Sequence, residues 1–320
     1  MTPIRTVLCP VDFSASSRRE LALATQICQR TGARLVLHHD LESVPPPCLG
    51  AGWMWSESHA SEEQAKQAHA ERVLAELMGQ LPPGLTVESK ISKAPLGDSI
   101  LYLADRLPSD LIVMATHDGR TPDHEPVTER IVLRARCPVL TTRDAGDRIV
   151  LPDLGPRCKN RIPVLVPIDG TEHALRALHY AFELGDFFPF DFELLCVEGR
   201  ICWDDLRHGT RFNVREHREQ RLESARQRLH EMIPIRLEPR TRVAVRLGPA
   251  AGEILRHAQE RGIQLILLGL HAKSVWARLL SGATSCEILH QSICPVWFVS
   301  EVAARHSRRP IAELATAATA

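Results

Sequence analysis

The chain has 320 residues, and its 39 Lys and Arg balance its 39 Asp and Glu. This length predicts one large domain or two of ordinary size. The balanced charge argues against a general affinity for nucleic acid or for an anionic membrane surface. Nine cysteines without a CxxC pair favour reduced thiols and a cytoplasmic setting. We find no apolar run long enough to span a membrane, and the first residues, MTPIRTVLCPVDF, predict a strand instead of a signal peptide.

In the first half of the chain, short apolar runs alternate with segments of helical period. Ser17 and Glu20 predict a capping box at the start of the first helix, and a longer charged helix is predicted over residues 61–80. Residues 144–161 mix Gly, Pro and charge, and we place a linker at residues 147–161. The predicted strands are Thr6 to Val11, Arg34 to His38, Thr86 to Ile91, Asp110 to Ala115 and Pro138 to Thr142.

The second half of the chain shows the same alternation. An apolar stripe that includes Leu175 and Leu178 predicts its first helix, and an Arg-rich helix is predicted over residues 214–231. The Ala-rich residues 301–320 predict a flexible tail. Strands that are apolar on both faces favour a parallel sheet covered by helices on each side. The predicted strands are Pro163 to Ile168, Glu193 to Val197, Arg242 to Leu247, Gln264 to Gly269 and Pro295 to Val299.

The two halves also share sequence motifs. VLCPVD at residues 7–12 is repeated as VLVPID at 164–169, and RCPVL at 136–140 is repeated as ICPVW at 293–297. Both repeats have an offset of 157 positions. DLIVMATH at 110–117 matches QLILLGLH at 264–271, at an offset three residues shorter. The sequence therefore predicts two homologous α/β domains, at residues 1–146 and 162–300.

The beginning and the end of each copy carry a family resemblance. Each copy opens with a strand that ends in an Asp and a turn, DFS at residues 12–14 and DGT at 169–171, and closes with a Cys-Pro-Val strand. In the second copy, the fourth strand runs into the glycine-containing loop GLHAKSVWARLLSGATS at residues 269–285. On these motifs, which span residues 6–299, the chain resembles a tandem universal stress protein.

The resemblance implies an open, five-stranded parallel sheet in each domain, with strand order 3-2-1-4-5, helices on both faces and dimer-like packing of the two domains. It also implies that nucleotide-binding members hold ATP across the carboxyl ends of strands one and four. Ligands of doubly wound sheets settle at this switch point for topological reasons. We therefore expect an internal pseudo-dimer, and leave open whether the chain forms a homodimer.

The second copy keeps small residues where the family places its phosphate loop. Gly269 and Gly282 match family glycines, whereas Ala272 and Ala283 replace a glycine and a serine. Phosphate binding needs exposed N–H groups at a turn and a helix N-terminus, which small residues permit. In the family, the Asp contacts the adenine or the ribose. The predicted nucleotide site is Pro167, Ile168, Asp169, Val197, Leu268, Gly269, His271, Ala272, Lys273, Gly282, Ala283 and Thr284.

The first copy lacks these features. Ala115 stands at the position of Gly269, and the loop after it is three residues shorter and contains Asp118, Asp123 and Glu125. Carboxylates would repel a triphosphate in a confined cleft. We predict that the first copy does not bind ATP in the manner of the family.

Structural interpretations remain open for the main site residues. Gly269 and Gly282 could be packing and turn glycines, and Asp169 could support the cap of the next helix. His271 and its counterpart in the first copy recur, which favours a structural hydrogen bond over a catalytic role.

Other chemistry is weakly indicated. A metal site at residues 38–40 (HHD) is disfavoured because neighbours on a strand point to opposite faces. Cys137 and Cys294 are predicted to be core thiols. The chain has no GxSxG, GxxxxGK[ST] or HExxH motif.

The sequence thus predicts a cytoplasmic stress-response regulator. Its C-terminal domain is expected to bind one adenine nucleotide, ATP or another, either with or without Mg²⁺. We expect no enzymatic activity beyond slow ATP hydrolysis, and an unidentified protein partner. The alternative is a nucleotide-free scaffold that presents residues 53–55 (WMW) or the segment around Trp203 to a protein or an apolar ligand.

Overall fold

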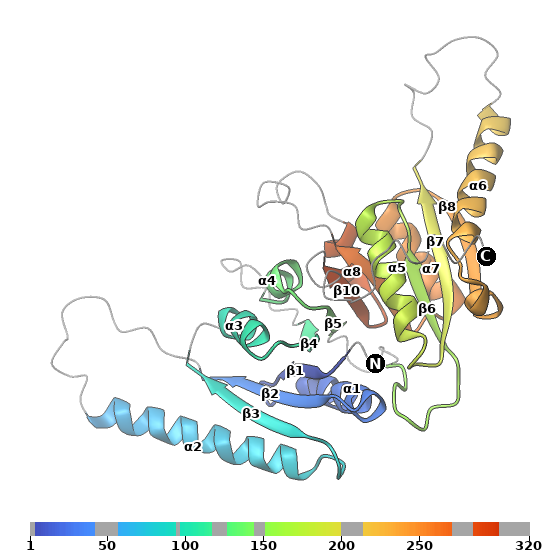
Figure 1. Ribbon diagram of the computed structural model, residues 1–320. Helices are drawn as coiled ribbons and strands as arrows, with labels where there is room; N and C mark the ends of the chain where they lie inside the picture. The colour runs from blue at the N-terminus through green and yellow to red at the C-terminus, as the bar shows by residue number, and fades with distance from the viewer. Residues whose placement is uncertain are drawn as a thin grey trace, which may run out of the picture.

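The computed structural model describes residues 4–41, 57–93, 97–116, 127–143, 151–199, 214–270 and 284–300, with side chains from residue 62 in the second range and from 218 in the sixth. Ten strands in these ranges form one sheet, in the order β3-β2-β1-β4-β5-β10-β9-β6-β7-β8 (Figure 1). Each half of this order is a five-stranded parallel sheet with strand order 3-2-1-4-5. The predicted fold is therefore confirmed.

The first domain supplies the β3 end of the sheet. All five of its predicted strands are present, with ends that differ from the prediction by one or two residues. Its elements are β1 (Thr6–Pro10), α1 (Ala15–Thr31), β2 (Arg34–Asp40), α2 (Glu57–Gly79), β3 (Val87–Ser92), α3 (Asp98–Arg106), β4 (Leu111–Thr116), α4 (Val127–Arg134) and β5 (Val139–Arg143).

The second domain supplies the β8 end. Its predicted strands are also present, although β7 begins three residues earlier than predicted. Its elements are β6 (Ile162–Pro167), α5 (Glu172–Leu184), β7 (Phe190–Glu198), α6 (Val214–Glu231), the 3-10 helix η2 (Ile235–Arg240), β8 (Thr241–Leu247), α7 (Ala250–Arg261), β9 (Leu265–Leu270), α8 (Thr284–Gln291) and β10 (Val296–Ser300).

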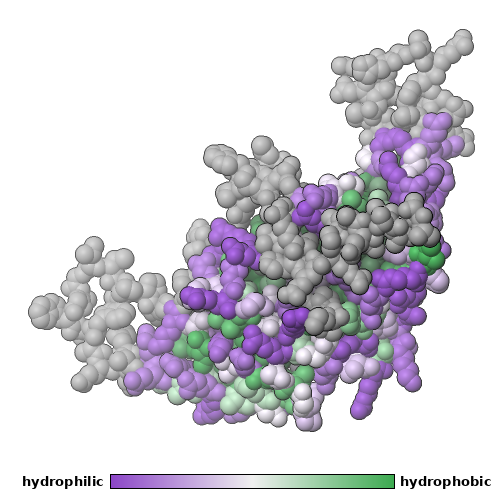
Figure 2. All heavy atoms as spheres, viewed as in Figure 1, coloured by the Kyte–Doolittle hydropathy of each residue, from purple (hydrophilic) through white to green (hydrophobic). Residues whose placement is uncertain are grey.

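Two hydrophobic cores cover the two faces of the sheet, and each core draws on both domains. Helices α1, α2, α5 and α6 contribute to one core, and α3, α4, α7 and α8 to the other. Successive strand residues alternate between them: Val7 lies in the first core and Leu8 in the second. Because the strands are buried on both faces, they need the continuous apolar runs that the sequence shows. Hydrophilic side chains predominate along the outer helices α2 and α6 (Figure 2).

The two domains are joined by antiparallel pairing of β5 with β10. Leu140 lies opposite Trp297, which is its equivalent 157 positions later, so an approximate twofold axis passes through this pair. Trp297 is fully buried, and its ring lies 6.1 Å from that of Tyr180, edge to face. The Thr141 hydroxyl adds a hydrogen bond of 3.3 Å to the Val296 carbonyl. The expected internal pseudo-dimer is therefore one continuous sheet.

The segment before β6 also connects the domains. Its Leu154 is fully buried in the first core. Arg30, near the end of α1, donates from Nε to the Leu154 carbonyl at 3.0 Å and from Nη1 to the Phe187 carbonyl at 3.1 Å. Its guanidinium also lies 5.8 Å from the centre of the Phe188 ring. One arginine of the first domain thus contacts both the linker and the second domain.

The predicted capping box at Ser17 and Glu20 is wrong. The N-cap of α1 is Ser14, whose hydroxyl accepts a hydrogen bond of 3.1 Å from the Ser17 N–H. Glu20 is buried instead, and its carboxylate accepts a hydrogen bond from the Thr142 hydroxyl on β5. A carboxylate that is buried in this way is costly without a hydrogen-bonding partner.

The thiol predictions are confirmed where the structure tests them. Cys137 and Cys294 are buried and free. Burial raises the pKa of Cys137 to about 12 and that of Cys294 to about 11, so both stay protonated near neutral pH. Among the described helices, none is both long and apolar enough to cross a bilayer.

Candidate functional site

The two strands at the switch point of the second domain separate toward their carboxyl ends. β6 pairs with β9 at Val164 with Leu265 and at Leu165 with Ile266, although both strands continue further. β1 and β4 pair over only two residues in the same way. Each domain therefore has unpaired strand ends where the strand order reverses, which is the position that the sequence predicted for a ligand.

Asp169 lies directly beyond β6, and its carboxylate shapes the turn into α5. Its Oδ1 atom accepts hydrogen bonds from the Thr171 N–H at 2.9 Å and from the Thr171 hydroxyl at 2.6 Å. Thr171 in turn caps α5 by accepting from the Ala174 N–H at 3.3 Å. Asp169 is exposed, and its Oδ2 atom has no hydrogen bond to any residue within the described ranges. One oxygen thus has a structural role, and the other can accept a ligand hydroxyl.

Gly269 has a structural reason to be glycine. A Cβ atom at this position would lie 2.4 Å from the His173 carbonyl oxygen and 2.7 Å from its carbon, in the first turn of α5. Backbone atoms cannot move aside as the end of a long side chain can, so α5 and β9 approach each other this closely only across a glycine. Gly269 alone is therefore not evidence for a phosphate.

The structure brings together the predicted site residues that it describes. Pro167, Ile168 and Asp169 follow one another at the end of β6. Val197 lies near the end of the neighbouring strand β7, and the Ile168 N–H donates to the Leu195 carbonyl of β7 at 2.8 Å. Leu268 and Gly269 lie on the other neighbour, β9, and Thr284 begins α8. The remaining predicted residues, His271, Ala272, Lys273, Gly282 and Ala283, lie outside the described residues.

The carboxyl ends of the first and second strands differ between the domains, and sequence reasoning missed this difference. In the first domain Phe13 stacks on His39, with ring centroids 4.1 Å apart, and His39 Nδ1 lies 2.8 Å from the Val11 carbonyl oxygen. The equivalent residues 157 positions later are Gly170 and Cys196. Two stacked rings therefore lie beside the turn in the first domain, where the second has a glycine and a thiol. Aligning the two halves would have given the signal.

The backbone supports the same comparison. Phe13 has φ of 65°, whereas Gly170 occupies the same left-handed region at φ of 78°. This region strains a bulky residue and suits glycine, so the stack on His39 helps to hold an unfavourable turn. The second domain forms its turn without strain and without rings.

The structure describes only some of the residues on which the predicted lack of ATP binding in the first domain rests. Ala115, at the position of Gly269, is buried, and its carbonyl accepts a hydrogen bond of 3.2 Å from the Thr128 hydroxyl of α4. The acidic residues Asp118, Asp123 and Glu125 lie outside the described residues. The prediction that they exclude ATP stays a prediction.

Metal ligation is not supported where side chains are described. His38 Nε2 lies 3.0 Å from the Ser92 hydroxyl and 3.2 Å from Asp40 Oδ1. His39 instead contacts the Val11 carbonyl, on the other face of the strand. No group of three or more His, Cys, Asp or Glu able to hold a metal ion occurs in the described part of the chain.

Comparisons with known proteins agree with this architecture. The sequence model of the universal stress protein family matches residues 3–143 and again residues 162–300. A universal stress protein of Mycolicibacterium smegmatis is 24% identical over 298 residues, which are 92% of this chain and 96% of that protein. The crystal structure of a universal stress protein from Archaeoglobus fulgidus is similar with a TM-score of 0.66 at 17% identity, over 93% of this chain and 97% of that one.

Two further structures widen this comparison. A functionally unknown protein from Pseudomonas aeruginosa is similar with a TM-score of 0.56 at 18% identity, over 98% of each chain. A universal stress protein solved in complex with cAMP covers 44% of this chain and 98% of its own, with a TM-score of 0.29, which is too low to place a ligand here. The repeated match of the family model to both halves is decisive: the chain belongs to the universal stress protein family and carries two of its domains in tandem.

Proposed function

We propose that this protein binds one adenine nucleotide, ATP in the first instance, at the switch point of its second domain. The observation that carries this proposal is the difference between the two domains beside that point. In the second domain a Cβ atom at Gly170, next to the exposed Asp169, would meet nothing within 4 Å, whereas the stacked rings of Phe13 and His39 fill the equivalent place in the first. A flat purine needs such a space beside a carboxylate that can accept a ribose hydroxyl.

The phosphate end of the nucleotide would lie toward α8. Thr284 begins this helix, and the preceding loop carries Lys273 and Gly282 in the sequence. A helix N-terminus with small residues before it presents N–H groups to an anion, and a lysine adds positive charge. If Mg²⁺ accompanies the nucleotide, the phosphate oxygens would supply most of its ligands.

We propose that the protein acts as a regulator instead of an enzyme, and that nucleotide binding changes a surface that a partner protein recognises. Two features of the described crevice favour this role. Asp169 Oδ1 accepts two hydrogen bonds in the turn, and we assign Oδ2 to a ribose hydroxyl, which leaves no oxygen of this carboxylate to act as a general base. Burial raises the pKa of Cys196, with Glu198 adding to the shift, so this thiol is a poor nucleophile.

The experiment is to measure ATP binding by isothermal titration and to assay adenine nucleotide released from the purified, denatured protein. The main variant is Gly170→Phe with Cys196→His, which places the ring pair of the first domain into the second. The first domain shows that this backbone accepts the pair, so the variant should fold and lose ATP binding by about tenfold or more, the effect of filling a pocket. Absence of nucleotide in both assays of the wild type would refute the proposal.

Asp169→Asn and Asp12→Asn form a matched pair of variants. Each aspartate accepts a hydrogen bond of 2.9 Å from the backbone two residues on, Thr171 N–H or Ser14 N–H, so both variants disturb the same kind of turn. Only Asp169→Asn should weaken ATP binding, by several-fold, because only it changes a ligand contact. Equal loss of affinity in both variants would indicate an effect through stability.

A second candidate function is a nucleotide-free scaffold. It is favoured by the contact between Gly269 and the His173 carbonyl and by the turn that Asp169 braces, since both explain family residues without a ligand. This scaffold would present a loop such as residues 53–55, which lie outside the described residues, to a protein or an apolar ligand. Unchanged thermal stability in saturating ATP, with loss of a partner in Trp53→Ala and Trp55→Ala, would favour it.

A further inference from the structure

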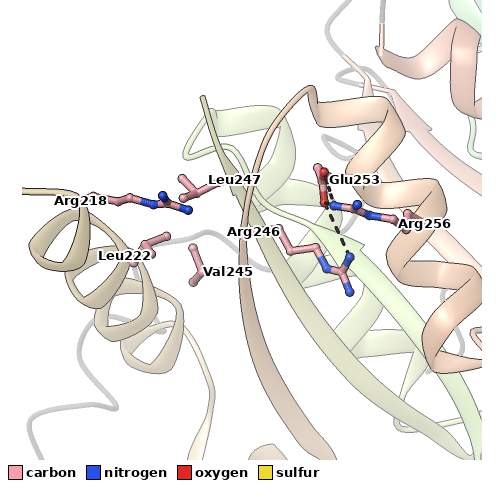
Figure 3. Close-up of a pocket in the computed structure, with 7 residues that line it drawn as sticks. All are labelled: Arg218, Leu222, Val245, Arg246, Leu247, Glu253 and Arg256. Carbon is pink, nitrogen blue, oxygen red and sulfur yellow. Dashed lines mark hydrogen bonds and ion pairs between the residues drawn. The ribbon is translucent and has the colours of Figure 1, made fainter. Parts of the chain in front are cut away.

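The outer edge of the second domain has a pocket that the proposed nucleotide site does not use. It has a volume of about 290 Å³ and lies around β8, the last strand of the sheet. Figure 3 shows that its residues lie on both sides of this strand, so the pocket follows the sheet edge. The residues that line it are Arg218, Leu222, Val245, Arg246, Leu247, Glu253 and Arg256.

The backbone of β8 has hydrogen-bonding groups that face outward. The Gly248 N–H donates to the Glu198 carbonyl of β7 at 3.1 Å. Because the direction of these groups alternates along a strand, the N–H and C=O groups of Val243, Val245 and Leu247 point away from β7. Within the described part of the chain, β7 is the strand that pairs with β8, so these groups remain available for another strand.

The opposite edge of the sheet is protected in a way that β8 is not. β3 has the sequence VESKIS, and its central residues Ser89 and Lys90 are exposed. Charged and polar residues in the middle of an edge strand discourage pairing with another chain. β8 has the sequence TRVAVRL and pairs with β7 over seven residues, with three apolar residues at its centre. The two edges occupy equivalent places in their domains, so this difference is not dictated by the fold.

The arginines at the β8 edge outnumber the carboxylates that they contact by one: Arg218, Arg246 and Arg256 stand against Glu253 and Glu260. The pocket is lined by three guanidinium groups and one carboxylate. Arg246 is fixed, because its Nε donates to His257 Nδ1 at 2.8 Å and its Nη2 to Glu260. Arg256 contacts the Glu253 carboxylate and its Nε lies 3.9 Å from Glu260 Oε1, but 57% of its side chain is exposed. Arg218 has no hydrogen bond or ion pair to any residue that the structure describes, so its guanidinium is available to donate hydrogen bonds to a carboxylate.

We infer that the β8 edge binds an extended, acidic peptide segment of a partner protein as an added strand. Its main chain would pair with Val243, Val245 and Leu247. Adjacent side chains of a strand point to opposite faces, so two neighbouring acidic residues would reach Arg218 on one face and Arg256 on the other. Apolar residues of the same peptide would contact Leu222 and the side chains of β8. This surface is separate from the nucleotide site, and it gives the partner of the regulator a place to bind.

The test uses the full chain and a dye-labelled, acetylated peptide, Val-Thr-Val-Glu-Glu-Val-Thr-Val, with binding measured by fluorescence anisotropy. Replacing both Glu by Lys should abolish binding, and added salt should weaken it. Methylating alternate peptide nitrogens on the edge that faces β8 should also abolish it, because strand addition needs those N–H groups. The inference fails if the peptide does not bind, or if the Lys or the N-methylated peptide binds equally well.

The matched protein variants are Arg218→Glu and Arg226→Glu, both on α6. Arg226 pairs with Glu223 on the same helix at 2.7 Å and does not line the pocket. Arg218→Glu should weaken binding by about tenfold, the usual effect of losing one charge-assisted contact, and Arg226→Glu by less than about twofold. Equal weakening by both would overturn the inference, since it would indicate attraction by net charge alone. Circular dichroism checks that both variants fold.

Discussion

The two domains share the same strand order but bury polar groups at different places. In the second domain, Glu193 of β7 is buried with His257 of α7, and Glu193 Oε1 lies 2.7 Å from His257 Nε2. The first domain has Val36 and Leu103 at the equivalent positions. The fold therefore does not need this pair. In the second domain, the contact with His257 compensates the buried charge of Glu193.

The reverse exchange occurs on the other face of the sheet. Glu20 of α1 contacts Thr142 of β5 in the first domain, and the second domain has Ala177 and Val299 at those places, both buried. A carboxylate and its partner thus appear or disappear together. Because the other copy already contains the apolar version, each pair can be tested by transplanting residues between domains.

The largest effect is expected for His257→Leu. Among the described residues it leaves the buried Glu193 carboxylate with Arg261 alone, whose Nε lies 3.3 Å away, and it should lower the free energy of unfolding by about 3 kcal/mol. The double variant Glu193→Val with His257→Leu copies the first domain and should recover part of this loss. Urea unfolding followed by circular dichroism measures both. If the double variant is less stable than the single one, the two residues do not compensate each other.

Gly269→Ala should lower the free energy of unfolding by about 2 kcal/mol, the cost of overpacking against backbone. The added methyl group would meet the His173 carbonyl, which cannot rotate away. Ala115→Gly, at the equivalent position of the first domain, should cost at most about 1 kcal/mol through chain entropy. Thermal unfolding of the two variants, compared with the wild type, tests this asymmetry. A harmless Gly269→Ala would leave the phosphate interpretation as the better explanation of this glycine.

Thr142→Val should lower the free energy of unfolding by about 1.5 kcal/mol, because Glu20 loses a hydrogen bond to its charge. Adding Glu20→Ala makes this part of the core like that of the second domain and should offset the loss of the hydrogen bond. The free energies of a double-mutant cycle in urea give the coupling between the two residues. Strictly additive effects would show that Thr142 does not stabilise the carboxylate.

The smallest effect concerns pH and belongs to the second domain. Burial lowers the pKa of His179, and Glu183 partly opposes this shift. The unfolded chain then binds a proton more readily than the folded one, so stability should fall as the pH drops below about 6.5 toward the lower folded pKa. In His179→Gln the change in Tm between neutral and mildly acidic buffer should be smaller than in the wild type. An unchanged difference would assign this pH dependence to other groups.

Much of the fold could be predicted from the sequence because the relevant signals are local and occur twice. Apolar runs such as residues 7–11 and 164–168 gave all ten strands to within a few residues. The likeness between the copies gave the two domains, and the family resemblance implied the strand order and a dimer-like packing of the domains. The composition of the loops also distinguished the two copies: residues 269–285 have two glycines, whereas the corresponding loop of the first copy is acidic.

The candidate site could be predicted only in part. The sequence correctly placed Asp169 directly after a strand. It did not predict that one carboxylate oxygen would accept hydrogen bonds from Thr171 while the other stayed open, because this depends on the conformation of Thr171. Phe13 and His39 are 26 residues apart in the chain, and they come together because β1 and β2 lie side by side in the sheet. A local sequence pattern does not predict such a contact. Glu20 was misplaced for the same reason, since its partner lies 122 residues away.

The sequence by itself determined that this protein has two universal stress protein domains and that only the second keeps small residues in the loop after its fourth strand. Tertiary structure decided which side chains fill the space around each switch point, how β5 and β10 join the two sheets, and which strands form the two edges of the sheet in the described part of the chain. The physical reason is that periodicity and spacing record which face of a strand or helix is buried. The identity of the neighbour on that face follows only from how the elements pack.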